Sequence, residues 1–414
     1  MSIPSLALKP IGYKAGKLYS QLPTSGVGDF TVSRASTATR VNKSGLIETV
    51  GADVPRLDYS DGGCPVLLTE PQSTNEVLWS EELENVAWTK AKVSVSDNSV
   101  ISPTGNLDGT TLVETAEVAD HAIISVTATV VAGDTYTVSS YIKPRGRNVS
   151  IAGYGGGFTN AFRATFDTTT FTLINTLSQG DGVAESAKIE AKGNGWYRIS
   201  VTGSLATDTT IRHVVYVLDG TSQNYLGDIT KGVDLYGAQL EELSYATSYI
   251  KTEGTAITRV ADIVSGAGDA TSFKSSEGTL FLHAKCPDDN TNQFMGLVEN
   301  TGSGEYIAIY GSGGNDKWSA SVRRGTDVYY FSTADFFAKS VMSKIAVVWS
   351  GTSVTFYING TKGNTQAILT PFPLNTFNNL TLDFSSSDFY GETKEIQVFN
   401  TELTEAEAIT LTTL

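Results

Sequence analysis

Residues 134–143 read DTYTVSSYIK, and this stretch decides the fold class. Tyr136, Val138, Ser140 and Ile142 alternate there with threonine and serine. A period of two sends alternate side chains to opposite faces of a β-strand. The pattern therefore predicts a strand with one buried face.

Similar patterns recur on both sides of this stretch. In the middle of the chain they cover residues 121–131, 196–203, 211–218 and 233–240. In the last third they cover 279–285, 305–310, 317–322, 327–332, 344–350, 353–359 and 379–384. Only TEAEAI at 404–409 carries a helix signal, a capping box followed by apolar residues. Many strands without intervening helices predict an all-β protein built from two consecutive antiparallel β-sandwiches of the jelly-roll type.

The length of the chain sets its domain organisation. A single hydrophobic core stops growing near roughly 250–300 residues, so 414 residues predict at least two domains. We expect an irregular N-terminal segment at 1–75, a first sandwich at 76–264 and a second at 268–414. The small, flexible sequence SGAGD at 265–269 marks the second boundary.

Composition excludes several classes of partner. The chain holds 29 basic and 44 acidic residues, a net charge of −15. Such a surface repels phosphates and anionic lipid, so we expect no nucleic-acid partner. No apolar run approaches the ~20 residues that span a bilayer, and the first residues lack the features of a signal peptide, so no membrane insertion is expected. Two cysteines supply neither a disulfide framework nor a Cys-rich zinc site.

The first part of the chain resembles a known family. The segments are FTVSRASTATRV at 30–41, GLIE at 45–48, VPRLDY at 54–59 and LLTEP at 67–71. Together they resemble the N-terminal module of many bacteriophage virion proteins, the tail or capsid fibres and adhesins. In that family the module leads, through a stretch like NEVLWSEELENVAW at 75–88, into a sandwich similar to carbohydrate-binding modules. The end of that sandwich in the family resembles three segments of this chain, LYGAQLEE at 235–242, ATSYI at 246–250 and TRVAD at 258–262.

The last part resembles a concanavalin A or laminin-G-like sandwich. The segments are EGTLF at 277–281, VTFYING at 354–360, IQVFN at 396–400 and LTEAE at 403–407. Together the resemblances imply a phage virion structural protein that binds host-surface glycans, is assembled in the bacterial cytoplasm and resides on the virion. They imply attachment to other virion proteins through residues 1–75, bacterial surface polysaccharide as the partner, and a homotrimer.

Catalytic signatures are missing from the sequence. The three histidines, His121, His213 and His283, lie in predicted strands and in no catalytic motif. Neighbouring acids such as Asp288 and Asp289 point to opposite faces of a strand. We therefore expect no enzyme. Two alternatives stay open: a capsule or exopolysaccharide depolymerase, whose acids come from distant strands, and a purely structural virion protein without a ligand.

Sugar binding needs flat aromatic faces flanked by planar polar groups. Two clusters have this makeup. The favoured one lies in the last domain and comprises Trp318, Tyr329, Tyr330, Asp316, Arg323 and Arg324. Tyr329 and Tyr330 must point to opposite faces, so at most one shares an exposed platform with Trp318. The second cluster comprises Tyr154, Phe158, Asn160 and Arg163. The alternative for every ring is packing in a core.

No cofactor is expected apart from a structural calcium ion. Calcium prefers hard oxygen ligands, and Asp383 and Asp388 flank the serines of a predicted loop. The alternative is a pair of solvated loop carboxylates.

Overall fold

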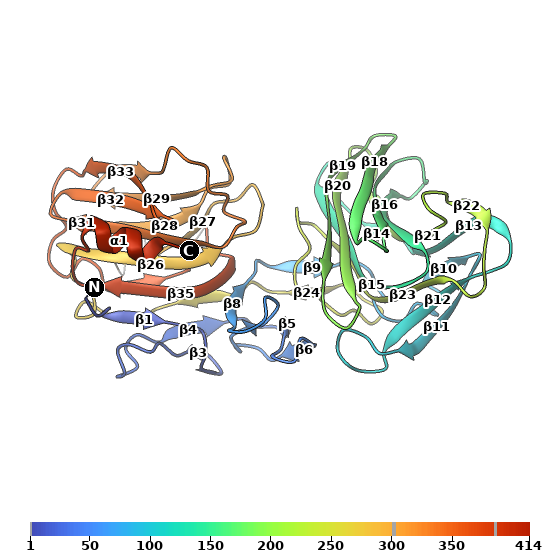
Figure 1. The fold of residues 1–414 in the computed structure, drawn as a ribbon, viewed down its shortest axis with the longest axis horizontal. Coiled ribbons are helices and arrows are strands. Elements are labelled where there is room, and N and C mark those ends of the chain that lie inside the picture. The colour runs from blue at the N-terminus through green and yellow to red at the C-terminus, as the bar shows by residue number, and fades with distance from the viewer. Residues whose placement is uncertain (1, 300–303, 385–386) are drawn as a thin grey trace. The chain divides into compact units, whose positions relative to one another are not determined.

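The computed structural model describes residues 2–299, 304–384 and 387–414 (Figure 1). These residues form strands throughout, with one helix, α1 (Glu405–Thr412), among them. They divide into two compact units, the terminal unit (Met1–Lys43, Val50–Pro71 and Val260–Leu414) and the central unit (Ser44–Thr49 and Gln72–Arg259). Each unit contains packed antiparallel sheets, so the predicted all-β fold is confirmed. Within the described part of the chain, no helix is long and apolar enough to cross a bilayer.

The central unit is a sandwich of two sheets. The first has the order β11 (Val93–Val100), β12 (Gly109–Glu114), β23 (Gly232–Glu241), β15 (Thr135–Arg145), β20 (Tyr197–Leu205) and β19 (Gly182–Ala191). The second has the order β10 (Trp88–Ala91), β13 (Val118–Ser125), β21 (Thr210–Leu218), β16 (Asn148–Gly155), β17 (Ala161–Asp167) and β18 (Thr172–Gln179), with β14 (Ala128–Thr129) and β22 (Asn224–Leu226) at its margins. A short pair, β9 (Ser73–Asn75) and β24 (Ile257–Arg259), completes the unit.

Strand β15 contains most of the stretch DTYTVSSYIK at 134–143, for which the sequence predicted a single buried face. Tyr136, Val138 and Ile142 lie in the core between the sheets, as the alternation predicts. The opposite face is buried as well. Thr137 donates its hydroxyl to Leu243 O at 2.7 Å, and Tyr141 packs in a separate aromatic cluster. The expectation of one buried face was wrong, because the chain after β23 returns across this sheet.

The terminal unit is also a sandwich. Its larger sheet has the order β33 (Thr361–Ala367), β32 (Ser353–Ile358), β31 (Ser343–Ser350), β26 (Glu277–Lys285), β35 (Gly391–Phe399), β8 (Val66–Thr69) and β7 (Leu57–Asp58), and β1 (Leu6–Leu8) also pairs with β35. The facing sheet has five strands, β30 (Asp327–Phe331), β29 (Trp318–Arg324), β28 (Tyr306–Gly311), β27 (Gln293–Val298) and β34 (Asn379–Thr381). A small sheet contains β2 (Tyr13–Lys14), β3 (Lys17–Leu18), β4 (Phe30–Ser33) and β25 (Ile263–Ser265). The short strand β5 (Ala38–Val41) also belongs to this unit, whereas β6 (Ile47–Val50) falls mostly within the central unit.

The first residues of the chain belong to the terminal sandwich. Leu6 and Leu8 are fully buried in the same core as residues of β26 and β31, and β1 pairs with β35 in antiparallel register. Phe30 of β4 is buried in that core too. Most of the predicted attachment segment therefore contributes apolar side chains to the last sandwich. The domain boundaries drawn from the sequence stay a prediction.

Helix α1 covers the outer face of the larger sheet (Figure 1). Thr404 caps the helix and forms the predicted capping box with Glu407, which is confirmed. Ala408 packs against Phe281, Ala346 and Tyr357 on that face. Apolar outer positions of this sheet are thus shielded by a helix.

A buried ion network joins the segments that carried the resemblance to virion proteins. The Arg34 Nη1 donates to Asp262 Oδ1 at 2.7 Å, and the second oxygen of Asp262 accepts from Arg56. Arg56 also pairs with Glu70 at 2.6 Å. Burial alone would lower the pKa of Arg56, but the carboxylates of Asp262 and Glu70 outweigh it and raise that pKa. These residues hold the terminal unit together, because each buried guanidinium has a carboxylate partner.

Candidate functional site

The five-stranded sheet of the terminal unit carries aromatic rings on its outer face. Ile307 and Ile309 of β28 point into the core, so Tyr306 and Tyr310 point outward. Phe294 stacks on Tyr310 with ring centroids 4.6 Å apart, and Phe384 lies 5.8 Å from Phe294. Phe384 in turn meets Tyr306 edge-on at 5.9 Å. We call these four half-buried rings the aromatic strip.

Small residues lie between the rings. Gly296, Ala308 and Ser321 are register partners across β27, β28 and β29 on the same outer face. A Cβ at Gly296 would lie 2.3 Å from Ile307 O, so this position needs glycine. The row of small side chains leaves the flanking rings standing above the sheet.

A cleft of about 270 Å³ opens beside one end of the aromatic strip. Its lining residues are Val298, Glu299, Gly304, Glu305, Tyr306, Arg323, Asn379, Thr381, Asp383 and Phe384. Aromatic rings, an amide, a guanidinium and carboxylates therefore meet in one concave site. This is the composition of sites that bind small polar ligands with an apolar face.

Several polar groups of the cleft have capacity for a ligand. Asn379 Oδ1 is buried and has no hydrogen-bond partner among the described residues, and the same holds for Glu305 Oε2. The other oxygen of Glu305 pairs with Arg324. Arg323 makes one long hydrogen bond, from Nε to Gly325 O at 3.4 Å. A saccharide offers both donors and acceptors, and its hydroxyls could satisfy these groups while a ring face stacks on Tyr306 or Phe384.

The structure corrects the predicted position of Trp318. Its side chain is 1% exposed, lies in the core of the terminal unit and stacks on Phe389 at 6.3 Å. Trp318 shares the inward face of β29 with Ala320 and Val322. The ring therefore presents no surface to a sugar, and the expected exposed platform around it was wrong.

The other residues of the favoured cluster are spread over β29, β30 and the turn before β29. Tyr329 pairs with Val322 and packs against the core, whereas Tyr330 pairs with Ser321 and is 62% exposed. The two tyrosines thus point to opposite faces, as predicted. Asp316 lies in the turn before β29, and Arg323 lies near the other end of that strand. Of the predicted cluster, Arg323 alone lines the cleft.

Burial and the nearby carboxylate of Asp288 raise the pKa of Asp316. Asp316 is therefore part of a carboxyl pair rather than a neighbour of the tyrosines. The binding role assigned to these residues from the sequence stays a prediction.

The second predicted cluster lies in the central unit. Tyr154 of β16 is 5% exposed, and its ring centroid lies 5.6 Å from that of Phe158. Arg163 of β17 lies on the same outer sheet face. Asn160 is turned away to Asp208, with its Nδ2 at 2.7 Å from Oδ2. The structure therefore brings three of the four residues to one face.

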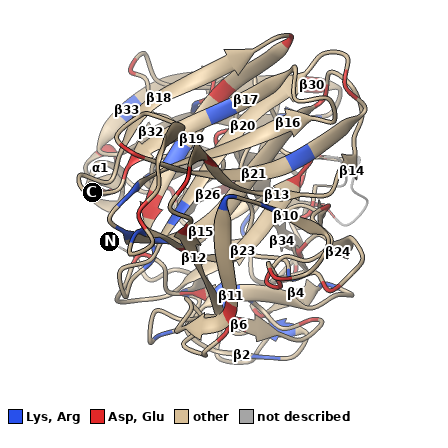
Figure 2. Ribbon diagram, turned by 90° about the vertical axis from the view of Figure 1, so that its right-hand side faces the viewer, with Lys and Arg blue, Asp and Glu red and all other residues tan. Residues whose placement is uncertain are grey.

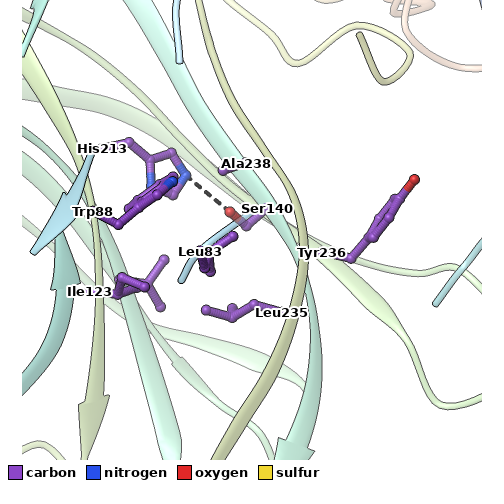
Figure 3. A pocket seen from close by; sticks show the side chains of 9 residues that line it. Leu83, Trp88, Ile123, Ser140, His213, Leu235, Tyr236 and Ala238 are labelled. Carbon is purple, nitrogen blue, oxygen red and sulfur yellow. Dashed lines mark hydrogen bonds between the residues drawn. The ribbon is translucent and has the colours of Figure 1, made fainter. Parts of the chain in front are cut away.

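A small cavity in the central unit has no features of a ligand site (Figure 3). It has a volume of about 10 Å³, at the lower limit for a single water molecule. His213 lies on its wall, with Nε2 3.0 Å from Ser140 Oγ, and Trp88 meets the imidazole edge-on. Burial lowers the pKa of His213 to about 4, so the ring is neutral at pH 7. His213 is therefore a neutral histidine of the core, and its Nδ1 is buried without a hydrogen-bond partner among the described residues.

The predicted calcium ligands lie close together. Asp388 Oδ1 accepts from Phe384 N at 2.9 Å, and its Oδ2 accepts from Tyr390 Oη at 3.1 Å. Burial and the carboxylate of Asp383 raise the pKa of Asp388. Within residues 2–299, 304–384 and 387–414, no group of three or more His, Cys, Asp or Glu side chains could hold a metal ion. The calcium site stays a prediction.

Sequence reasoning missed the aromatic strip. The signal for half of it is present in YIAIY at 306–310, where Tyr306 and Tyr310 fall on one face of a predicted strand. Phe294 and Phe384 come from segments far along the chain, and only strand pairing brings them beside the tyrosines.

Comparison with known proteins identifies the type of the last domain. Residues 265–408 match the family described as the Concanavalin A-like lectin/glucanases superfamily. No protein with a curated description matches the chain.

Three similar solved structures contain β-sandwich domains. The carbohydrate-binding module CBM40 of the Ruminococcus gnavus IT-sialidase, bound to α2,3-sialyllactose, is 17% identical over 36% of this chain and 93% of its own, with a TM-score of 0.30. Domain 4 of AbnA, a GH43 extracellular arabinanase from Geobacillus stearothermophilus in complex with arabinotriose, is 13% identical over 41% and 82%, with a TM-score of 0.32. Mouse laminin α1 domains LG4-5 are 9% identical over 68% and 86%, with a TM-score of 0.25. The last domain of the chain is a laminin-G-like, concanavalin A-like jelly roll.

Proposed function

We propose that the chain is a non-catalytic glycan-binding protein that holds a saccharide in the cleft of the terminal unit. The observation that carries this proposal is the aromatic strip, which ends at a cleft containing Arg323 and the amide oxygen of Asn379, for which the described residues supply no partner. Sugar rings stack on aromatic faces and exchange hydrogen bonds with planar polar groups. A single site of this size is expected to bind with around millimolar affinity.

A glycan array with the full chain, followed by titration of the best neutral oligosaccharide, tests this function. Replacing Tyr306 with alanine removes a ring that lines the cleft and should weaken binding about 10-fold or abolish it. Tyr19→Ala is the matched control, because Tyr19 is an exposed tyrosine of the same unit outside the cleft. Equal binding by the Tyr306→Ala variant and the parent chain would place the sugar elsewhere or refute binding.

The proposed biological setting is the surface of a bacteriophage, where the chain attaches to other virion proteins and meets bacterial polysaccharide. The support is the resemblance of residues 30–71 and 258–262 to virion proteins. Many weak sites on one particle would supply avidity, and a homotrimer is the proposed oligomer. Mass measurement in solution and detection of the chain in purified particles test the oligomer and the setting separately.

A polysaccharide depolymerase is the second candidate, because Glu299, Glu305 and Asp383 all line the cleft. Glycoside hydrolysis uses two carboxylates on either side of a scissile bond. Release of reducing ends from a bound polysaccharide, lost on Glu299→Gln, would favour the enzyme. Binding without release favours the non-catalytic protein.

A further inference from the structure

The central unit carries a second surface with different chemistry, on the outer face of its larger sheet. Strands β17, β16 and β21 lie side by side there, and Figure 2 shows basic residues on β17 and β21. Ala152 of β16 is the register partner of Arg163 on one side and Val214 on the other. Tyr154, two residues along, is the partner of Arg212. We call this surface the arginine face.

The floor of the arginine face is apolar and its edges are aromatic. Ala152, Ala161 and Val214 are fully buried on it. Tyr154 and Tyr216 rise from the floor with ring centroids 6.2 Å apart. Phe158 is exposed at one end, and Arg212 Cζ lies 5.3 Å from its ring centroid. The face therefore combines an apolar base with two guanidinium groups.

The guanidinium of Arg163 has no partner of its own. It forms no hydrogen bond or ion pair with any residue that the structure describes, and its Nε is buried. The Nε of Arg212 is likewise buried without a partner, and its Nη1 donates only to the Ser125 carbonyl at 3.1 Å. Leaving a buried donor unpaired costs free energy, so the guanidinium of Arg163 is available to a partner from outside the chain.

The nearby carboxylates do not supply that partner. Asp208 accepts a hydrogen bond from Asn160, and Asp120 accepts one from Asn224 at 3.3 Å. Neither forms an ion pair with Arg163 or Arg212 in the described part of the chain. The arginine face is thus a local positive site on a chain with a net charge of −15. Such a chain repels polyanions, so the ligand must carry a single negative charge and must offer apolar surface as well.

We propose that the arginine face binds acidic saccharides, with the carboxylate of a uronic or ulosonic acid residue held by Arg163. The planar fork of a guanidinium matches the two oxygens of a carboxylate, and charge-assisted hydrogen bonds of this kind are the strong ones. The sugar ring would lie against Phe158, the exposed ring of this face, because Ala152 and Tyr154 present almost no surface to solvent. This inference takes glycans as the ligand class from the proposed function but places them at a separate site.

The test uses the full chain carrying Tyr306→Ala, so that the cleft of the terminal unit does not contribute to glycan binding. The acidic probes are galacturonate and sialyllactose, which each carry one carboxylate, and their neutral counterparts are the methyl ester of galacturonic acid and lactose. NMR titration that follows the arginine Nε–H signals should show binding of at least one acid, about 10-fold or more tighter than its neutral counterpart. Arg163→Gln should remove that preference, and Arg163→Lys, which keeps the charge but loses the fork, should retain part of it.

Arg145→Gln is the matched control, because it removes one positive charge at the end of β15 in the other sheet of the same unit. It should leave acid binding unchanged. Equal binding of acid and neutral probes, unchanged binding by Arg163→Gln, or no binding of either acid up to about 10 mM would each overturn the inference. In all three cases, the proposed function would still be upheld if the parent chain binds neutral glycans and the Tyr306→Ala variant does not. Acid binding at the arginine face without any neutral-glycan binding in the cleft would uphold this inference and refute the proposed function.

Discussion

Arginine plays two different parts in the two units. In the terminal unit, Arg34 and Arg56 are fully buried, and both pair with Asp262. In the central unit, Arg163 is half-buried on a sheet face and has no partner among the described residues. The same guanidinium therefore stabilises a fold where the chain supplies carboxylates and offers a binding group where it does not.

The difference shows what a sequence motif can mean. Arg34, Arg56 and Asp262 lie in the segments that resemble virion proteins, and their ion pairs tie three separate stretches of the chain together. Arg163 lies in no motif. Partners in space, rather than presence in a motif, separate a structural arginine from a ligand-directed one.

Removing the carboxylate of Asp262, which Arg34 and Arg56 share, should have the largest effect on stability. Asp262→Ala removes the carboxylate that pairs with buried Arg34 and Arg56 and should lower the free energy of unfolding of the terminal unit by about 3–5 kcal/mol. Urea denaturation, with hydrogen exchange to distinguish the units, measures the loss. Asp335→Ala, at an exposed position of the same unit, should change stability by less than about 0.5 kcal/mol. A loss at Asp262 no larger than that of the control would mean that the network contributes little.

Acid should destabilise the central unit through His213. The pKa of His213 is about 4 in the folded chain, against an ordinary value of 6.5, so the unfolded chain binds the proton more readily. Stability is full above pH 6.5 and falls as the pH drops toward 4, by about 3 kcal/mol in total. His213→Gln should remove this slope from hydrogen exchange in β15 and β21. The terminal unit should keep its own acid sensitivity, because burial lowers the pKa of His283 to about 4 as well. An unchanged slope in the variant would assign the effect to other groups.

The smallest effect on stability is expected at the arginine face. Arg163→Gln breaks no hydrogen bond or ion pair within the described chain and should change the free energy of unfolding by less than about 0.5 kcal/mol. Thermal unfolding of the parent and variant chains measures the difference. A loss of several kcal/mol would class Arg163 with Arg34 and Arg56 as a structural residue, and the comparison between the units would no longer hold.

Local sequence indicated some of the strands and the one described helix, but β11, β12 and β16 to β19 had no predicted counterpart. The alternation in DTYTVSSYIK placed β15, and TEAE at 404–407 placed the start of α1 with its capping box. Both signals act over a few residues, because strand periodicity and capping depend on near neighbours along the chain. Of the candidate residues, Arg323, Tyr154 and Arg163 were singled out from the sequence because aromatic and planar polar residues clustered in their segments, and their binding role stays a proposal.

Tertiary structure decided which faces are covered and which rings meet. A period of two groups Trp318 with Ala320 and Val322, but it does not say that this group faces the core. The same period could not reveal that residues after β23 cover the second face of β15, or that Phe384 reaches Tyr306. Those contacts join segments far apart in the sequence, so they depend on how strands pair and how sheets pack, and no local pattern reveals them.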